Sequence, residues 1–300
     1  MKQKQAILGY CLAAVITSGI FLSGCDKDDD IDLPPIGGYN NSDEVGAANL
    51  VGYWSFDGNG QESKSGNNPT SSINATYVSG GVRGQALSLN DGYLYYASNL
   101  AALTTNQPFT VSAWVQVTNT GGTPTNYPYM YFQSAIPGQL FGNFNGLLET
   151  GQFPVASDTL IVKSIYKDLN GGTQDNINNY TGTPGTDYKF IKKAGTSQWV
   201  HVVTTYNPTG GTGNESIFRI YGDSTLVSNK NFENRGTASF KYTPGEIIIG
   251  GWYNNIPGKQ VSTDDWTVPF KGKIDEIRVW NKLLPESDIV ALYQLGKQNR

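Results

Sequence analysis

Cysteine, histidine and charged residues are scarce in this chain. Among its 300 residues there are two cysteines and one histidine, and only 15% of the residues are charged. A single histidine excludes every metal site built on a pair of histidines, and the low charge argues against a coiled coil. Acidic residues outnumber basic ones, 25 to 21, so the chain offers no electrostatic basis for binding nucleic acid. Aromatic residues are plentiful, at 12%, and this argues against disorder.

The start of the chain has the pattern of an export signal. Lys2 and Lys4 precede an apolar run over residues 6–22, which ends just before Cys25. This order is typical of a secretory signal peptide. The ending Leu-Ser-Gly-Cys resembles the lipobox of bacterial lipoproteins, which implies cleavage before Cys25 and attachment of lipid to its thiol. An ordinary signal peptide and a transmembrane helix are the alternatives.

An acidic tether is expected after this cysteine. Residues 26–30 contain four aspartates and resemble the signal that directs lipoproteins of Bacteroidetes to the cell surface; a solvated spacer is the alternative. Residues 25–47 are rich in Asp, Gly, Pro and Asn, which predicts flexibility. The sequence thus predicts a signal peptide over 1–24, a lipidated tether over 25–47 and an outer-membrane lipoprotein exposed at the cell surface. Cys11 would leave with the signal peptide, so the mature chain would contain no disulfide.

The rest of the chain has the pattern of an all-β domain. Short runs of β-branched and aromatic residues alternate with clusters of Gly, Asn, Thr and Ser, which predicts a sandwich or barrel. A short helix is expected over 285–293, because it begins with proline and has acidic residues in its first turn. The runs that we expect to be strands are 50–56, 85–89, 93–96, 109–115, 199–206, 217–221, 246–250 and 272–280.

Four of these segments and the helix carry a family resemblance. The motifs, in order, are Phe56-Asp57-Gly58-Asn59, the run 109–115, Trp199-Val200-His201-Val202-Val203 and the run 272–280. Together they resemble the laminin G-like domains of the concanavalin A-like lectin/glucanase superfamily in their bacterial form. The resemblance covers roughly 48–298 and implies a jelly roll of two antiparallel sheets, so we expect one domain over 48–300. The segment 116–198 is longer than the resemblance leads us to expect.

A structural calcium site is one candidate. Asp57, Asn59 and Glu62 cluster after the first predicted strand, and Asp275 lies in a late one. Calcium takes six to eight oxygen ligands, which carboxylates and amide carbonyls supply. The resemblance implies that this loop and Asp275 meet near the two chain ends, where the ion would hold the termini together. It also implies an Asp where Glu62 stands. The alternative is that Asp57 caps a turn and Asp275 pairs with a basic residue.

Catalysis has little support in the sequence. Glycosidases need two carboxyl groups at a set separation. Residues two apart share a face of a strand, but Asp264-Asp265 and Asp275-Glu276 are adjacent pairs, so neither has that spacing. The glucanase and lyase motifs of the superfamily are absent as well. His201 alternates with apolar residues on a predicted strand, so we expect it to be a buried structural residue rather than a general base.

An aromatic surface for stacking on sugars is the remaining candidate. Loops flank Trp252 and Trp266, so we expect these rings to be the most open to a ligand. The alternative is that they are edge or core aromatics of an aromatic-rich sandwich. The predicted ligand-binding residues are Trp252, Tyr253, Asn254, Asp265, Trp266 and Tyr129. The favoured function is therefore a non-catalytic, lipid-anchored protein with a monomeric ectodomain that binds glycan or polysaccharide. A protein-binding adhesive module and a glycoside hydrolase or polysaccharide lyase are the alternatives.

Overall fold

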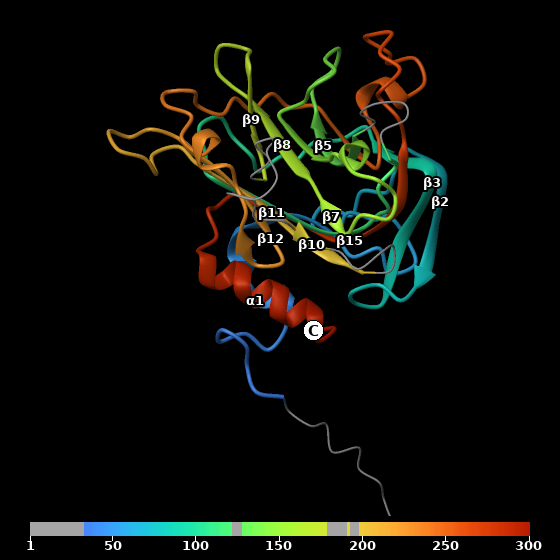
Figure 1. The fold of residues 1–300 in the computed structure, drawn as a ribbon, viewed down its shortest axis with the longest axis horizontal. Helices are drawn as coiled ribbons and strands as arrows, with labels where there is room; N and C mark the ends of the chain where they lie inside the picture. The colour runs from blue at the N-terminus through green and yellow to red at the C-terminus, as the bar shows by residue number, and fades with distance from the viewer. Residues whose placement is uncertain (1–32, 122–127, 179–190, 193–197) are drawn as a thin grey trace, which may run out of the picture. The chain divides into compact units, whose positions relative to one another are not determined.

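The main body of the protein is one antiparallel sheet that curls over on itself (Figure 1). The computed structural model describes residues 33–121, 128–178, 191–192 and 198–300. Apart from the gaps between those ranges, the compact unit Pro35–Arg300 is described in full. The predicted signal peptide and Cys25 lie outside the described residues. Within the described part, no helix has the length and apolar character needed to cross a membrane.

The described strands of the main sheet follow one path with two additions. The path begins with β13 Thr225–Leu226, β12 Ile217–Gly222, β11 Val200–Asn207, β4 Phe109–Gln116 and β15 Phe270–Trp280. It continues through β3 Gln85–Tyr96, β14 Glu246–Ile249, β5 Tyr129–Ala135, β6 Phe144–Leu148, β8 Val162–Lys167 and β9 Thr173–Ile177. Strand β1 Leu50–Trp54 pairs with β15, and β2 Ser71–Ser79 pairs with β3. Strands β7 Thr159–Leu160 and β10 Ile191–Lys192 form a separate pair.

The predicted architecture is confirmed: the domain is an antiparallel β sandwich, with one short α-helix at its C-terminal end. Its two layers are continuous, because the long strand β3 pairs with β15 of one layer and β14 of the other. Where the curled sheet meets itself, Asn176 on β9 donates to the Phe218 carbonyl on β12 at 2.7 Å. The buried side-chain amide thus provides a hydrogen bond for a backbone carbonyl where β9 meets β12.

Large apolar side chains fill the space between the two layers. Alternation along each strand sends every second side chain inward, and aromatic residues dominate the positions that meet. Phe109 on β4 stacks on Tyr206 at 5.3 Å and meets Phe144 of the other layer edge-on at 5.8 Å. Trp54 packs against Phe132 at 5.6 Å. These contacts across the layers provide the core on which an unbridged chain of this size depends.

Helix α1, Glu286–Lys297, covers the outer face of one layer (Figure 1). Its buried face, with Ile289 and Leu292, packs against Val203 and Tyr221 of the sheet. The helix runs beyond the predicted end at 293. Gly296 lies where any side chain would meet Trp114, since a Cβ atom there would come within 2.5 Å of the indole ring.

The segment 35–49 also packs onto this outer face, which differs from the prediction of a flexible tether up to residue 47. It forms two short 3-10 helices, η1 Ser42–Glu44 and η2 Ala47–Asn49. Val45 is buried against the sheet, and its carbonyl accepts the indole N–H of Trp280 at 3.1 Å. The composition of this segment is polar, but partners on β15 hold it in place.

Candidate functional site

The loop between β14 and β15 brings together five of the six predicted ligand-binding residues. Trp252 precedes the short helix η5, Tyr253–Asn255, and the rest of the loop folds back over it. The side chain of Asn254 organises the loop. Its oxygen accepts the Val261 N–H at 2.9 Å, and its NH₂ group donates to the Ser262 hydroxyl at 2.6 Å. The loop is therefore held by its own side chains.

The expectation of an exposed ring at Trp252 is corrected by its burial. Its side chain is 1% exposed, and its indole N–H donates to the Pro128 carbonyl at 3.1 Å. Tyr253 is also buried, and its hydroxyl accepts the Gly138 N–H at 3.0 Å. Both rings cover apolar residues on the outer face of the sheet, so neither presents a face on which a sugar can stack.

Trp266 and Asp265 are the more accessible members of the group. Trp266 is half-buried and lies nearly parallel to Phe141, with the ring centroids 6.5 Å apart. It also meets the buried Trp252 edge-on at 5.0 Å. Asp265 is exposed beside it. Trp266 is therefore the part-exposed tryptophan of this loop, and it packs against the buried Trp252.

The proposed calcium ligands do not converge. The Glu62 carboxylate accepts backbone N–H groups from Tyr53 at 2.7 Å, Lys64 at 2.9 Å and Ser65 at 2.6 Å. Asp57 accepts the Gln85 N–H at 2.8 Å, while the side-chain oxygen of Asn59 accepts the Gln61 N–H at 2.8 Å. N–H donors point at the oxygens that calcium would need, and no group of three or more His, Cys, Asp or Glu within the described ranges is placed to hold a metal. These residues do not fit the ion.

Asp275 instead holds the loop between β2 and β3. One of its carboxylate oxygens accepts the N–H groups of Val82 at 2.6 Å and Arg83 at 3.4 Å. Burial, together with the charge of the neighbouring Glu276, raises the pKa of Asp275 to about 8 against the opposing effect of these hydrogen bonds. Both ends of this loop are fixed by a carboxylate, since Asp57 binds the N–H of Gln85. Asp275 thus stabilises the backbone of this loop.

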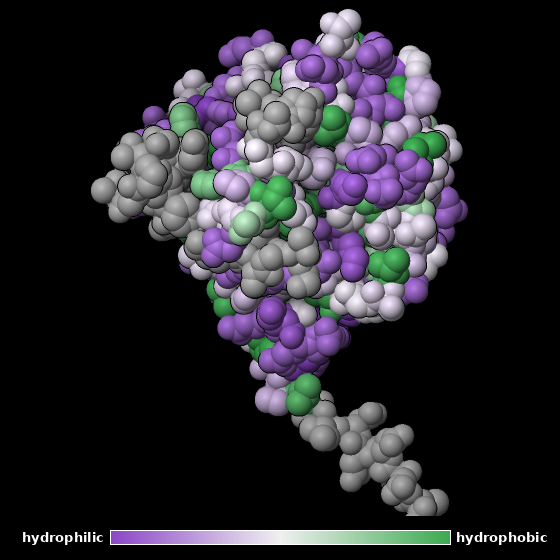
Figure 2. Space-filling model, turned by 45° about the vertical axis from the view of Figure 1, so that its right-hand side comes forward, coloured by the Kyte–Doolittle hydropathy of each residue, from purple (hydrophilic) through white to green (hydrophobic). Residues whose placement is uncertain are grey.

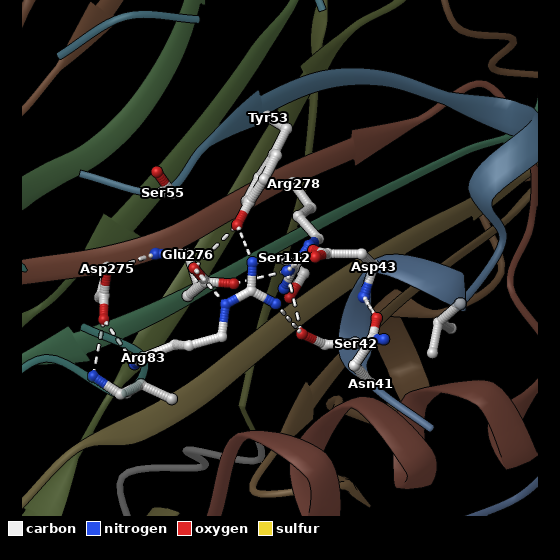
Figure 3. A network of polar contacts seen from close by, with 12 residues as sticks. Asn41, Ser42, Asp43, Tyr53, Ser55, Arg83, Ser112, Asp275, Glu276 and Arg278 are labelled. Atoms are coloured by element: carbon white, nitrogen blue, oxygen red, sulfur yellow. Dashed lines mark hydrogen bonds and ion pairs between the residues drawn. The ribbon is translucent and has the colours of Figure 1, made fainter. Parts of the chain in front are cut away.

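A β-bulge places adjacent acidic residues on the same side of β15, contrary to what simple alternation predicts. The register shifts between Asp275 and Arg278, and Glu276 has a positive φ of 51°. Glu276 therefore reaches the same outer face as Asp275 and Arg278 (Figure 3). Both carboxyl groups are buried beneath neighbouring segments, so no substrate can reach the pair.

Glu276 is the centre of a buried network that fastens the segment 35–49 to the sheet (Figure 3). Its carboxylate lies 2.5 Å from Arg278 and accepts the Tyr53 hydroxyl at 3.0 Å. Asp43 bridges two guanidinium groups, with Arg83 and Arg278 each at 3.0 Å. These partners lower the pKa of the Asp43 carboxyl against the opposing effect of its burial. The network is structural, because its charges neutralise one another.

His201 is buried, as the sequence predicted. It shares a hydrogen bond of 2.8 Å with the Ser112 hydroxyl and stacks on Trp114 at 4.7 Å. Burial lowers the pKa of His201 to about 3, helped by the nearby positive charge of Arg278. The imidazole is therefore neutral and enclosed.

The sixth predicted residue, Tyr129, lies elsewhere, in a groove of about 370 Å³ between the end of β4 and strands β3 and β15. We call it the β15 groove. Tyr129 is 7% exposed, packs against Phe270 at 5.3 Å and has a phenol whose pKa is raised by burial and by the charge of Asp91. The groove is lined by Ser88, Leu89, Asn90, Gln116, Val117, Thr118, Asn119, Thr120, Tyr129, Lys271, Gly272 and Lys273.

The backbone of β15 and a buried amide shape this groove. Gly272 has a φ of 146°, and a Cβ atom there would lie 2.5 Å from the Gln116 carbonyl, so only glycine lets the two strands approach this closely. After β4 ends, Asn119 holds the departing chain by donating to the Thr159 carbonyl at 2.9 Å. The buried Thr120 hydroxyl, in the same wall, has no hydrogen-bond partner within the described structure. The lining offers amides, hydroxyls and ammonium groups, and no carboxylate.

A family model described as the concanavalin A-like lectin/glucanases superfamily matches residues 89–290. The chain belongs to this superfamily. The match includes β4, β11 and β15, which carry three of the four motifs identified in the sequence. A sequence search of curated proteins found no match.

Solved structures show the same superfamily fold. The binding domain of the botulinum neurotoxin C/D mosaic serotype matches with a TM-score of 0.51 and 13% identity over 82% of this chain and 51% of that one. Domain 4 of AbnA, a GH43 extracellular arabinanase from Geobacillus stearothermophilus solved with arabinotriose, matches with a TM-score of 0.47 and 20% identity over 82% and 98% of the two chains. The chain thus spans about half the length of the neurotoxin domain. These likenesses concern the fold alone.

No pattern in the sequence marked most of the β15 groove. Lys271 and Lys273 stand at alternate positions of a strand, and lysines are mostly exposed in proteins of any kind. Asn90 and Gln116 are strand residues of the same ordinary kind. Only their register, with Lys271 opposite Asn90 and Lys273 opposite Gln116, brings them to one place.

Proposed function

We propose that this protein is a non-catalytic carbohydrate-binding protein whose ligand lies in the β15 groove. The observation that carries the proposal is the lining of this groove, where amide and hydroxyl side chains lie beside the apolar residues Leu89 and Val117, with the buried Tyr129 at its base. Sugars offer hydroxyl groups on their edges and apolar C–H groups on their faces. A cleft that combines polar groups with apolar side chains matches both.

Two observations support this function over its alternatives. A glycosidase needs a pair of carboxyl groups at the scissile bond, whereas the lining of the β15 groove includes no carboxylate. An adhesive protein surface calls for a continuous apolar patch. On the face shown in Figure 2, the hydrophobic residues form small separate spots among hydrophilic ones.

The same proposal includes export and anchoring. A signal peptide ending before Cys25, followed by an acidic segment, supports a lipoprotein held at the outer membrane and exposed at the cell surface. Mass spectrometry of the membrane-extracted protein tests this part, because lipidation of Cys25 adds a defined mass that a Cys25→Ala variant lacks.

Binding to a polysaccharide panel tests the function itself. The expected result is retardation by at least one glycan, weakened in the Asn90→Ala/Gln116→Ala variant and unchanged in Trp266→Ala. If Trp266→Ala abolishes binding and the groove variant does not, the site lies at the loop between β14 and β15. Absence of binding to every glycan would make a protein partner the better hypothesis, and release of reducing sugar would contradict the non-catalytic assignment.

A further inference from the structure

The β15 groove has two ammonium groups along one side. Lys271 and Lys273 are two residues apart on β15, so their side chains leave the same face of the strand about 7 Å apart. Lys271 is exposed and Lys273 half-buried. Neither has a carboxylate partner among the described residues, whereas Lys163 and Lys259 are paired with Asp175 and Glu246 at 3.1 and 2.7 Å.

Within the described structure, these two ammonium groups carry no paired carboxylate, although the protein as a whole carries a net charge of −4. The groove lining contains no acidic residue. Two carboxyl groups stand nearby. Asp91 is exposed, and its charge contributes to raising the pKa of the Tyr129 phenol. Asp275 lies two residues beyond Lys273 on the same face of β15, but it is buried and accepts the N–H groups of Val82 and Arg83. Two ammonium groups at a groove in an acidic protein form a local site for anions.

We infer that the β15 groove takes an acidic glycan, with Lys271 and Lys273 binding the carboxylate or sulfate groups of the sugar chain. The inference rests on the proposed function and adds the chemical class of the ligand. Ammonium groups form charge-assisted hydrogen bonds with such anions, which are about twice as strong as neutral ones. Asn90 and Gln116 supply groups for the sugar hydroxyls.

The test compares polymers that differ only in charge. The purified protein is titrated with polygalacturonate and with its fully methyl-esterified form, and in parallel with dextran sulfate and dextran. We expect binding to at least one of the two acidic polymers and much weaker binding to its neutral counterpart. The member of each pair that binds distinguishes carboxylate from sulfate recognition.

Variants link the preference to the groove. Lys271→Gln/Lys273→Gln is expected to lower affinity for the acidic polymer at least about tenfold and to reduce its dependence on salt, because two charge-assisted contacts are lost. The matched control, Lys230→Gln/Lys241→Gln, makes the same change in net charge at exposed positions outside the groove and is expected to keep wild-type affinity. Asp91→Asn removes the nearby carboxylate and is expected to strengthen binding.

Several results would overturn the inference. One is equal affinity for acidic and neutral polymers. Another is equal loss in the groove and control variants, which would show non-specific attraction by charge. Binding of neutral glycans alone, sensitive to Asn90→Ala/Gln116→Ala, would refute the acidic ligand and leave the proposed carbohydrate-binding function standing. Failure to bind any polymer of either kind would remove both.

Discussion

Replacing Arg278 with methionine is expected to destabilise the folded protein by about 3 kcal/mol. The guanidinium of Arg278 lies 2.5 Å from the Glu276 carboxylate, and the two side chains are only 3% and 2% exposed. Removing one partner of a buried ion pair costs about 3–5 kcal/mol, because the other charge stays buried without compensation. Glu276 would keep the Tyr53 hydroxyl at 3.0 Å and the Arg83 Nε at 3.8 Å. These remaining contacts place the loss at the lower end of the range.

A surface ion pair provides the control. Arg219 and Glu233 are 2.9 Å apart, but the Arg219 side chain is 43% exposed, so Arg219→Met is expected to cost no more than about 1 kcal/mol. The double variant Glu276→Gln/Arg278→Met should recover part of the loss, since no charge is left unpaired. Urea unfolding followed by tryptophan fluorescence measures all of these variants. Equal losses in Arg278→Met and Arg219→Met would refute the reasoning that burial makes the network sensitive.

Three further predictions concern acid stability, the aromatic loop and calcium. The folded protein keeps His201 neutral with a pKa of about 3, whereas the same imidazole in the unfolded chain takes up a proton below pH 6.5. The free energy of unfolding should therefore fall by up to about 1.4 kcal/mol per pH unit as the pH drops from 6.5 towards 3. His201→Gln should flatten that slope in unfolding measured between these pH values; an unchanged slope would contradict it. Trp252→Ala should lower the free energy of unfolding by about 3–5 kcal/mol, and Trp266→Ala should lower it clearly less, because Trp266 is only half-buried. Denaturation measures both losses, and the reverse order would contradict the burial of Trp252. Millimolar calcium should leave the melting temperature unchanged, because the Glu62 and Asp275 oxygens already accept N–H groups; a rise reversed by EDTA would restore the calcium site.

The core strands and the C-terminal helix could be predicted because their signals are local. Alternation over 109–115 and 199–206 predicted β4 and β11 to within a residue or two at each end. Proline and acidic residues marked the start of α1, and the order of the motifs was enough to identify the superfamily. The largely exposed strand β2, Ser71–Ser79, was missed, although Ile73, Ala75 and Tyr77 alternate there with polar residues.

The candidate site depended on contacts that no local pattern records. Trp252 is flanked by loop residues, yet the loop folds back and buries it over the sheet. The bulge in β15 brings Asp275 and Glu276 to one side, whereas regular alternation separates adjacent residues. A bulge depends on how two strands pair, so the sequence of one strand does not reveal it.

By itself, the sequence determined the fold class. Period-two patterning and turn residues act over a few positions and restrict the chain to a sandwich or barrel, and the family resemblance implies the sandwich. The tertiary structure alone decided where the polar residues act. Asp43, in a segment with the composition of a linker, is ordered because Arg83 reaches it from the loop between β2 and β3 and Arg278 reaches it from β15. Lys271 and Lys273 line a groove only because the register of β15 places them beside Asn90 and Gln116. Pairing between residues far apart in the chain sets both arrangements, and composition carries no information about it.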